Sequence, residues 1–496
     1  MTGPTPRYDF TAPVPPLEML GRVHLVAIGG AGMSAVARLL LDRGLPVSGS
    51  DSADSPILQS LRDSGARVHV GHDADHVIHA DTVVVSSAIR DDNVELAAAR
   101  GAGQRVLHRS QALASLMGDK RRVAVAGANG KTTTTSMLVV ALVAEGADPS
   151  FASGGEIAQL GTNAALGDGP AFVVEADESD GSFLTYRPDV AVVTNVQPDH
   201  LDFYGTPEAV ERAYASFVES LSTGGLLVAC QDDYGSRRLA DVARTAGRTV
   251  LTYGHDQGAD LRVGEVTSRG FGTRSVFSHG GAEQVLDLAV PGDHNVLDAC
   301  AAYLAAVAGL GADPDAVLAG LAGFRGVRRR FEVRGEVDGV TVVDDYAHNP
   351  AKVAAVVGTA AEIVRRSGQG ALRVVFQPHL YSRTRDFATA FAHALAAADQ
   401  VVLLDVYGAR EQPVEGVTSA LVGDPLRALP GQRTVLVGPT REQAVAALAD
   451  AAGPGDLLLT VGAGDVTALA PLLVEALDAR ARHDAALNAS APRETR

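Results

Sequence analysis

Short apolar runs of strand length alternate with Ala- and Leu-rich stretches of helix length along almost the whole chain. This alternation is typical of parallel sheets covered by helices on both faces, because such strands are buried on both sides. The sequence therefore predicts an α/β fold. The runs that we interpret as strands are residues 23–28, 82–85, 104–107, 123–126, 172–175, 190–193, 226–229, 340–343, 373–376, 401–405 and 457–461.

The chain has 496 residues, too many for one ordinary core, so we expect two to three domains. A charged stretch at 118–122 fits a domain boundary, and the arginine run 328–330 marks a second shift in composition. Short alternating runs at 261–290 predict a small antiparallel insert, and a helix is expected at 295–308. The polar, Ala-rich tail after about Ala479 is expected to fray.

The formal net charge of −17 disfavours non-specific nucleic-acid binding, which needs a positive surface. With 46% hydrophobic and 20% charged residues, the composition is typical of a globular protein. Only two cysteines occur, Cys230 and Cys300, so we expect a reducing compartment and no disulfide framework. Residues 1–16 do not resemble a signal peptide, and no apolar run is long enough to span a bilayer. We therefore expect a cytoplasmic protein without membrane insertion.

A glycine-rich turn follows the first expected strand. Gly30, Gly32 and Ala35 match the pattern G-x-G-x-x-A, and Asp51 follows at the end of a second expected strand. Glycines let the backbone approach a diphosphate, and the next helix presents N–H groups and a positive dipole to it. The motif alone is weak, because a tight strand-to-helix turn also favours glycine. It does not separate a dinucleotide cofactor from a UDP-sugar.

A stronger motif follows the expected strand at 123–126 and precedes a helix. Lys131 there can neutralise the β- and γ-phosphate oxygens of ATP, and the hydroxyl of Thr132 or Thr133 can bind Mg²⁺. A chance Gly-Lys-Thr at a helix start is the alternative, but the preceding strand and the run of hydroxyls favour a shortened phosphate loop. The loop consists of Gly127, Ala128, Asn129, Gly130, Lys131, Thr132 and Thr133.

Carboxylates and a histidine follow the next two expected strands, at the end of the sheet where ligands gather in doubly wound folds. We expect them to face the phosphate loop and to suit Mg²⁺, which prefers oxygen ligands. A functional role is favoured for Glu175, since a lone buried carboxylate is costly. For Glu178 and Asp180 a solvated loop position is an equal alternative. The other members of the group are Asp177, Asn195, Asp199, His200 and Asp202.

Together these motifs resemble those of the Mur ligases of bacterial peptidoglycan synthesis. The resemblance extends from about Arg22 to about Leu477 and so covers nearly the whole chain. The matching pieces follow one another in the family's order. They are residues 28–34, 127–135, 175–183, 194–195, 199–200, 294–295, 329–332, 344–348, 376–379 and 462–465.

The resemblance implies a three-domain Mur ligase architecture. A Rossmann-like UDP-binding domain would span 18–119, a central P-loop ATPase domain 120–328 and a C-terminal α/β domain 329–482. It implies ATP and Mg²⁺ as cofactors and, by the motifs that match best, UDP-N-acetylmuramate and L-alanine as substrates. The carboxylate of the nucleotide-sugar would be phosphorylated by ATP and then joined to the amine of alanine.

The same resemblance assigns roles to individual residues. The catalytic residues would be Lys131, Glu175, His200, Arg330 and Asp345, and the metal ligands Thr132, Glu175 and His200. The residues at the adenine, beyond the phosphate loop, would be Asn295 and Asp298. The residues that bind the UDP-sugar would be Gly29, Gly30, Gly32, Ser34, Asp51 and Ser87. The residues near the incoming alanine would be Tyr346, His348 and Arg383.

Four positions depart from the family pattern. Asn129, with Ala128 before it, replaces the usual His, Gln197 replaces the commoner Glu, and Asn349 replaces a second His. The fourth is Asp298, where the family has Asn. An Asn can donate to adenine N7 and accept from the N6 amino group, whereas an Asp can only accept. We hypothesise a weaker, less adenine-selective nucleotide site; the alternative is that Asp298 turns to water or a nearby arginine.

Other functions compete with alanine addition. A related ligase reattaches recovered peptide to UDP-N-acetylmuramate, but the short stretch 376–383 resembles the alanine-adding enzyme more. The UDP-type turn at 29–34 disfavours a folate-polyglutamate-type ligase. A non-catalytic UDP-sugar-binding regulator would not need Lys131, Glu175 and His200, and an NAD-dependent oxidoreductase leaves the phosphate loop unexplained.

Overall fold

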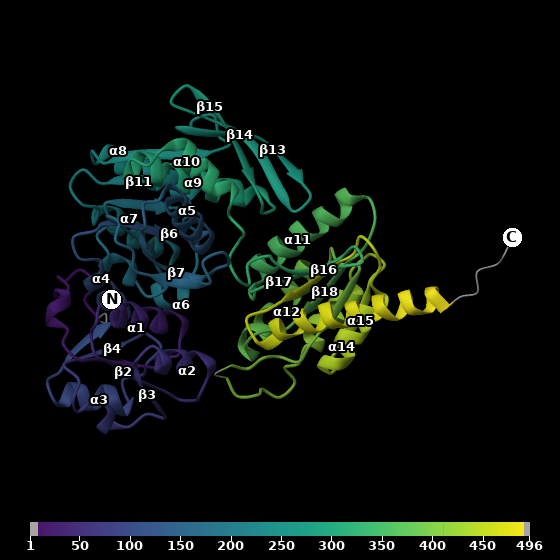
Figure 1. The fold of residues 1–496 in the computed structure, drawn as a ribbon, viewed down its shortest axis with the longest axis horizontal. Coiled ribbons are helices and arrows are strands. Elements are labelled where there is room, and N and C mark those ends of the chain that lie inside the picture. Colours follow the sequence, from purple (N-terminus) through teal and green to yellow (C-terminus); the bar gives the residue numbers. More distant parts are fainter. Residues whose placement is uncertain (1–7, 410, 491–496) are drawn as a thin grey trace. The chain divides into compact units, whose positions relative to one another are not determined.

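The computed structural model describes residues 8–409 and 411–490, without the side chains of Asp202 and of residues 485–490. It has the predicted α/β fold, with three separate sheets (Figure 1). Two compact units divide the chain: Met1–Arg325 holds the first two sheets and Gly326–Arg496 holds the third. The strands of each sheet fall within one of the three expected domain ranges, and the domain boundaries themselves stay a prediction.

The first sheet has five parallel strands, which are β1 (Val23–Val26), β2 (Val47–Asp51), β3 (Arg67–Val70), β4 (Thr82–Val85) and β5 (Arg105–His108). Its helices are α1 (Ala31–Asp42), α2 (Pro56–Asp63), α3 (Val94–Gly101) and α4 (Arg109–Met117). The strand order is β3-β2-β1-β4-β5; α1 and α4 cover one face and α3 the other. β1 ends two residues before the predicted end, because Ala27 turns the backbone with a φ of 58°.

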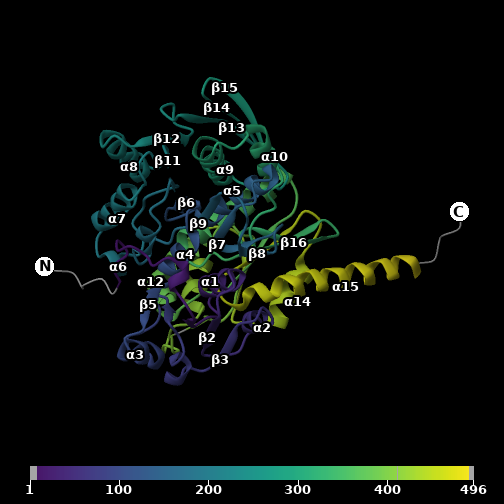
Figure 2. The ribbon, with the colours of Figure 1, turned by 60° about the vertical axis from the view of Figure 1, so that its left-hand side comes forward.

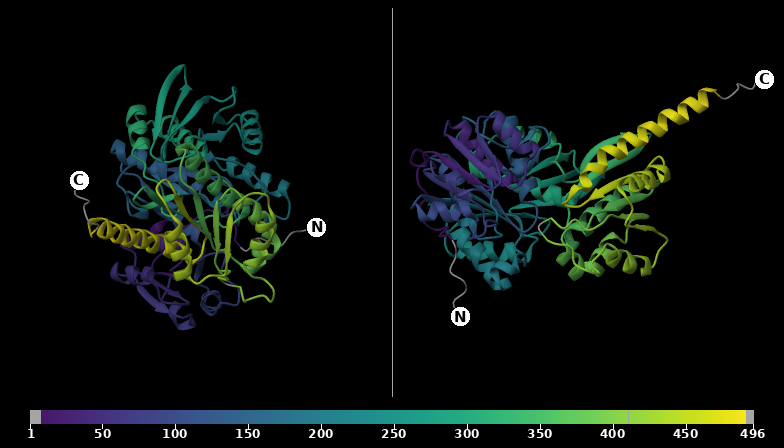
Figure 3. Two further views of the ribbon diagram at one scale, coloured as in Figure 1. Left: turned by 90° about the vertical axis from the view of Figure 1, so that its right-hand side faces the viewer. Right: turned by 90° about the horizontal axis from the view of Figure 1, so that it is seen from below.

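The second sheet has ten strands, which are β6 (Arg121–Ala126), β7 (Ser150–Ile157), β8 (Thr162–Ala165), β9 (Ala171–Glu175), β10 (Val190–Val193), β11 (Leu226–Cys230), β12 (Thr249–Gly254), β13 (Leu261–Arg269), β14 (Gly272–His279) and β15 (Ala282–Leu288). Their order is β15-β14-β13-β12-β11-β10-β6-β9-β7-β8. The antiparallel pairing of β13, β14 and β15 confirms the predicted insert (Figure 3). α1 packs on β7 and β8, so one hydrophobic core runs through both sheets of this unit.

Helices cover the second sheet and carry its loops. They are α5 (Lys131–Glu145), α6 (Leu201–Tyr204), α7 (Pro207–Glu219), α8 (Tyr234–Thr245), α9 (Asp293–Leu304) and α10 (Pro314–Ala322). α9 continues into a π-helical turn at Ala305–Leu310, so the helix predicted at 295–308 is present and slightly longer. Cys230 and Cys300 are both free and buried, as the sequence predicts.

The third sheet forms the second unit with strands β16 (Glu332–Val337), β17 (Val340–Asp345), β18 (Leu372–Phe376), β19 (Gln400–Leu403), β20 (Thr434–Val437) and β21 (Leu457–Val461). Their order is β16-β17-β21-β18-β19-β20, with only β16 antiparallel. The helices are α11 (Pro350–Ser367), α12 (Tyr381–Leu395), α13 (Ala420–Ala428), α14 (Arg441–Ala451) and α15 (Leu469–Ser490).

Helix α15 corrects one expectation. The tail was expected to fray after about Ala479, but α15 packs against α14 and β16 and stays helical to Ser490 (Figure 2). Alanine, the commonest residue of this tail, has the highest helix propensity, which explains why a polar tail is helical. The last six expected tail residues, 491–496, lie outside the described residues. Along the described part of the chain, no helix combines the length and the hydropathy needed to cross a membrane.

A buried carboxylate joins α3 to the first sheet. Glu95 is fully buried; its Oε2 accepts a hydrogen bond from Ser50 at 2.6 Å and lies 3.0 Å from His72 Nδ1. Its Oε1 lies 2.8 Å from His76 Nδ1. Burial would raise the pKa of Glu95, but hydrogen bonds from His24 and these partners outweigh burial and lower the pKa to about 2.

Replacing Glu95 with glutamine is expected to destabilise the protein at neutral pH by about 1–3 kcal/mol, because buried His24 and partly buried His72 and His76 lose a charged partner. The carboxylate contributes stability that is fully present above its unfolded pKa of 4.5 and is lost as pH falls toward 2. Urea unfolding at pH 3 and pH 7 measures the free energy of unfolding of the wild type, of Glu95→Gln and of the exposed control Glu18→Gln. A Glu95→Gln variant as stable as the control at pH 7 would contradict it.

Candidate active site

Three neighbouring strands of the second sheet, β9, β6 and β10, end side by side around the phosphate loop. The loop follows β6 and ends where α5 begins. Gly127 and Gly130 have φ values of 141° and 84°, which turn the backbone from strand to helix. Asn195, after β10, accepts a hydrogen bond from the Asn129 N–H at 2.9 Å and donates to the Asn129 carbonyl at 3.0 Å. The loop is therefore held from the neighbouring strand.

Lys131, which is partly buried, and Glu178, which is buried, form an ion pair at this loop. Lys131 Nζ lies 2.8 Å from Glu178 Oε1 and donates to the carbonyl of Gly127 at 2.5 Å. The two side chains are 16% and 3% exposed. His200 Nε2 lies 3.8 Å from the same Glu178 oxygen. Glu178 thus belongs to the site and is not a solvated loop residue, which was the alternative that the sequence left open.

The second oxygen of Glu178, Oε2, is buried and has no hydrogen-bond partner. Burial raises the pKa of Glu178, and Lys131 opposes the rise. A buried acceptor of this kind is costly unless something satisfies it, so the position suits a bound cation. Among the residues that the structure describes, however, no three His, Cys, Asp or Glu side chains are grouped closely enough to hold a metal ion.

The three expected metal ligands lie at or just beyond the ends of β6, β9 and β10 without forming such a group. Glu175, the last residue of β9, accepts a hydrogen bond from the N–H of Gly154 at 2.7 Å. Thr132 is buried in the first turn of α5, and the next hydroxyl, Thr133, is only partly buried. His200 has a φ of 53° and precedes α6. The structure therefore brings these side chains to one region but gives Glu175 a protein partner.

Two of the four departures from the family pattern contact each other. Asn129 Nδ2 donates to Gln197 Oε1 at 3.4 Å, and Gln197 Nε2 donates to Asp233 at 3.3 Å. This chain therefore has two neutral amides in contact where the family pattern has His and Glu. A third departure, Asn349, caps α11 by accepting a hydrogen bond from the N–H of Lys352 at 2.8 Å, a role that asparagine serves well.

Asp298 lies beneath the phosphate loop. Its Oδ1 accepts a hydrogen bond from the Thr134 hydroxyl at 3.0 Å, and the residue is 6% exposed. A Cβ built on Gly130 would lie only 2.5 Å from Asp298 Oδ1. Asn295, the other residue expected at the adenine, is buried and donates to the Pro291 carbonyl at 2.6 Å. Asp298 thus supports the loop from inside, and its expected effect on adenine selectivity stays a prediction.

Replacing Asp298 with asparagine is expected to stabilise the protein above pH 7. Burial raises the pKa of Asp298 from 3.8 to about 7. The folded state therefore favours the protonated acid. The stability that this preference contributes is fully present below pH 3.8 and is lost as the pH rises through 7. Asparagine is neutral at every pH and can still accept from Thr134. It should remove this loss, which is at most on the order of 4 kcal/mol for such a shift.

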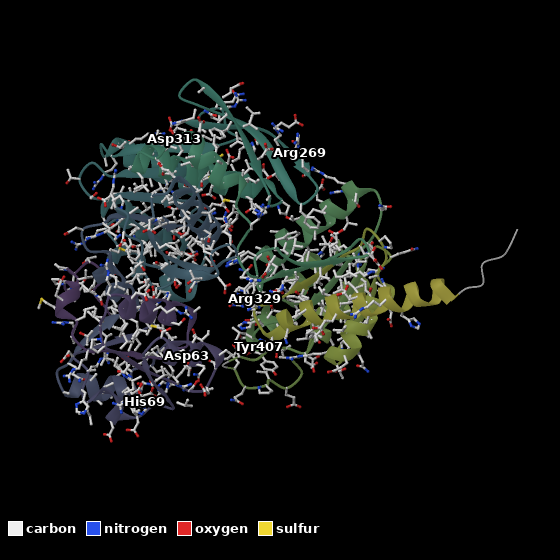
Figure 4. All side chains as sticks on the ribbon, viewed as in Figure 1. Asp63, His69, Arg269, Asp313, Arg329 and Tyr407 are labelled. Carbon is white, nitrogen blue, oxygen red and sulfur yellow. The ribbon has the colours of Figure 1, made fainter. Side chains whose placement is uncertain are left out.

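Unfolding temperatures at pH 5 and pH 8 measure this effect. The wild type should lose stability between the two values, and Asp298→Asn should lose less. The exposed Asp63, labelled in Figure 4, gives the matched control Asp63→Asn, which should behave like the wild type. Identical pH dependence of Asp298→Asn and wild type would contradict the assignment of a buried, protonated acid under the loop.

A pocket of about 310 Å³ lies at the carboxyl ends of β1 and β4, in the same unit as the phosphate loop. Gly30, Gly32 and Ser87, three of the residues expected to bind a UDP-sugar, line it. Asp51 instead holds the turn, because its Oδ2 accepts a hydrogen bond from the Gly29 N–H at 2.9 Å. The Ser34 hydroxyl, also expected to bind substrate, is used inside α1, where it donates to the Ala31 carbonyl at 3.1 Å.

The loop after β9 contains Asp177, Glu178 and Asp180, and we call it the acidic loop. It reaches this pocket. Asp177 Oδ2 lies 2.5 Å from Arg109 Nη2, and Asp180 accepts a hydrogen bond from Ser87 and lies 3.3 Å from His108 Nε2. One loop therefore contacts the residues around the pocket through Asp177 and Asp180 and the phosphate loop through Glu178. The sequence analysis missed His108 and Arg109; a polar pair at the end of an expected strand was the signal that could have found them.

In the second unit, Asp345 ends β17 and fixes two backbone segments. Its carboxylate accepts hydrogen bonds from the N–H of Phe331 at 2.8 Å and of Ala347 at 2.7 Å. Burial raises the pKa of Asp345 to about 6, although these bonds oppose the rise. The segment at 329–331 is tightly turned, with positive φ at Arg329 and Phe331. Asp345 therefore sets the position of Arg330, which lies between Arg329 and Phe331 in the chain.

The remaining expected residues gather at the same end of this sheet. The guanidinium groups of Arg329 and Arg330 lie 4.7 and 5.7 Å from the centre of the Tyr346 ring, a cation–π arrangement. His348 Nδ1 lies 3.0 Å from the Tyr346 carbonyl, and Arg383 donates to the His348 carbonyl at 3.3 Å. Burial lowers the pKa of His348 to about 4, so its ring is neutral at pH 7.

Two aromatic side chains that the sequence analysis did not assign extend this cluster. His379 lies 5.8 Å from His348, ring centre to ring centre, and stacks on Tyr407 at 5.8 Å. Arg329 and Tyr407 are labelled in Figure 4. His379 belongs to a matching piece of the resemblance and could have been found there, whereas no motif contains Tyr407. The cluster offers the guanidinium groups of Arg329, Arg330 and Arg383, a neutral histidine and aromatic faces to a small ligand.

Comparison with known protein families matches three parts of one family to this chain. The "Mur ligase family, catalytic domain" matches residues 22–121, the "Mur ligase middle domain" residues 125–306, and the "Mur ligase, glutamate ligase domain" residues 329–464. These three matches follow the order of the three sheets, and together they cover far more than half of the chain.

Two curated relatives are similar over their whole length. The UDP-N-acetylmuramate–L-alanine ligase of Kineococcus radiotolerans is 55% identical over 484 residues, 97% of this chain and 100% of the relative. That of Paenarthrobacter aurescens is 52% identical over 469 residues, 94% and 100% of the two chains.

Solved structures give the same picture. The crystal structure of UDP-N-acetylmuramate-alanine ligase from Thermotoga maritima is 30% identical, with a TM-score of 0.78 over 92% of this chain and 99% of that one. A murein peptide ligase from Psychrobacter arcticus is 22% identical, with a TM-score of 0.65 over 92% and 98% of the two chains. The second likeness shows the fold alone.

Proposed function

Because the chain belongs to the Mur ligase family, we propose that it joins L-alanine to the lactyl carboxylate of UDP-N-acetylmuramate at the expense of ATP, in peptidoglycan precursor synthesis. The observation that carries the proposal is the acidic loop after β9. Within one compact unit, this loop contacts Lys131 of the phosphate loop through Glu178. Through Asp177 and Asp180 it contacts residues around the 310 Å³ pocket at the glycine-rich turn. The two anionic substrates thus have adjoining sites.

The reaction has two steps. The substrate carboxylate attacks the γ-phosphorus of ATP, which gives an acyl phosphate and ADP. The amine of alanine then attacks the acyl carbon, and inorganic phosphate leaves with the former carboxylate oxygen. Lys131 neutralises charge on the phosphate oxygens in the first step, so ATP must replace Glu178 as its partner. Asn195 and Asp298 keep the loop around the phosphates in place.

The proposal includes a divalent cation at the same loop. We propose that Mg²⁺ is held by Thr132, Glu175 and His200, with the partnerless oxygen of Glu178 available beside them. The hydroxyl and carboxylate oxygens of Thr132 and Glu175 are donors that suit such an ion. When bound, it supplies positive charge to the phosphates during transfer. For this role Glu175 would exchange its hydrogen bond from the Gly154 N–H for the cation.

The second unit is proposed to receive the amino acid. Arg383 offers a guanidinium for the carboxylate of alanine, and neutral His348 and Tyr346 surround it. Arg330 is proposed to act on the charged intermediate, positioned by the bond from Phe331 to Asp345. A cytoplasmic site of action is part of the proposal. The two free, buried cysteines support it, because they suit a reducing compartment.

Phosphate release from ATP tests this function. Purified protein is given ATP, Mg²⁺ and UDP-N-acetylmuramate, and each amino acid is added in turn, with the tripeptide of the recycling reaction as a further arm. Release that depends on both the nucleotide-sugar and L-alanine supports the proposal. Release with the peptide alone would show the recycling ligase, and release in no arm would show a non-catalytic binder.

A further inference from the structure

Arg109 is the first residue of α4 and lies at the turn that follows β1. A Cβ built on Gly32 would lie 2.5 Å from Arg109 Nη1, so the guanidinium rests directly on this glycine. Any side chain at position 32 would push the guanidinium away. The second glycine of the motif is therefore needed to admit a cation to the turn, in addition to letting the backbone approach a diphosphate.

Arg109 is also the one cation among the residues that line the pocket. The others are Gly30, Ala31, Gly32, Met33, Ser86, Ser87, Ala88, Ser179 and Asp180. Its side chain is 30% exposed, so a ligand in the pocket can reach it. Next to it α1 begins, whose first N–H groups point toward the same turn. A guanidinium and a helix N-terminus at one turn favour a group with several negative oxygens.

In the structure the guanidinium of Arg109 pairs with a carboxylate of the protein, that of Asp177. Its Oδ2 lies 2.5 Å from Arg109 Nη2, and its side chain is 38% exposed. The guanidinium is thus held in position by an anion of the protein that an incoming anion can replace or join.

We propose that Arg109 binds the diphosphate of the nucleotide-sugar and that Asp177 is the counterion that holds it ready. The assignment rests on the proposed function, which supplies a nucleotide diphosphate as the substrate. In this proposal Arg109 binds the substrate and Asp177 is its exchangeable counterion. If the Asp177–Arg109 ion pair served only to join the two sheets, removing the charge of Asp177 would have the opposite effect on UDP binding.

Binding of UDP and of uridine, measured by calorimetry without ATP or alanine, separates the two. Arg109→Gln should weaken UDP binding about tenfold or more and leave uridine binding unchanged, because uridine has no phosphate. Asp177→Asn should bind UDP as tightly as wild type or more tightly, because it frees the guanidinium. Arg100→Gln, which removes another ion-paired arginine of the first domain, is the matched control and should bind UDP like wild type.

The proposal is overturned if Arg109→Gln binds UDP within about twofold of wild type, or if Asp177→Asn weakens UDP binding as much as Arg109→Gln does. Should Arg109→Gln not fold, Arg109→Lys keeps the charge without the planar fork and should weaken UDP binding by a smaller factor. In turnover, Arg109→Gln should raise KM for the nucleotide-sugar with little change in KM for ATP. Failure of wild type to release phosphate with alanine would contradict the proposed function and leave the UDP result standing.

Discussion

Lys131→Ala is expected to lower kcat about 10²- to 10³-fold, the cost of removing one preorganised positive group from a transferring phosphoryl group. Lys131 lies at the start of α5 and carries the partly buried ammonium of the phosphate loop. Steady-state phosphate release with saturating UDP-N-acetylmuramate and L-alanine measures the loss. The exposed Arg238→Ala on α8 is the control and should keep wild-type turnover.

The same change has a second consequence, because it leaves Glu178 buried without its partner. Removing one member of a buried ion pair typically costs about 3–5 kcal/mol. The double variant Lys131→Ala with Glu178→Gln should therefore regain much of the stability but none of the activity. Full activity in the single variant, or activity restored in the double variant, would show that Lys131 serves the fold and not phosphoryl transfer.

Gly130→Ala is expected to have the second-largest effect, and the helix that it begins contains its own control. Gly130 and Gly146 flank α5 and have nearly the same backbone conformation, with φ of 84° and 85°. An alanine at either position costs roughly 1–2 kcal/mol of backbone strain. At Gly146 nothing lies within 4 Å of the new methyl group, whereas at Gly130 it would lie 2.5 Å from Asp298 Oδ1.

Gly146→Ala should thus lose some stability and keep wild-type kinetics. Gly130→Ala must in addition displace Asp298 or the loop, and we expect kcat/KM for ATP to fall about a hundredfold or more, because misplacement by about 1 Å has effects of this size. Unfolding temperature and kcat/KM for ATP, measured on both variants, give the comparison. Equal kinetics in the two variants would rule out close support of the loop by Asp298.

Structural elements that depend on runs of adjacent residues could be predicted from the sequence. The phosphate loop, the strands around it and the antiparallel insert all follow from runs of adjacent residues, and the structure contains each of them. The end of β1 was placed two residues too late, because the apolar run continues through Ala27 although the backbone turns there. The helicity of α15 was missed because the polar composition of the tail outweighed its alanine content in the interpretation.

Side-chain pairs between distant segments were not predictable in the same way. Glu178 was open to two interpretations because its partner Lys131 lies 47 residues earlier. Arg109 was missed because its partner Asp177 lies 68 residues later, so no local pattern indicates that the two side chains meet. Asp298 was expected to face the adenine by resemblance, and only the fold reveals its contacts with Thr134 and Gly130.

The transfer of oxygen from carboxylate to phosphate tests the central claim most directly. UDP-N-acetylmuramate labelled with ¹⁸O in both lactyl carboxylate oxygens is turned over with ATP and L-alanine, and the released phosphate is analysed by mass spectrometry. An acyl phosphate intermediate predicts that each phosphate carries one ¹⁸O atom. Release of unlabelled phosphate in step with amide formation would contradict the account.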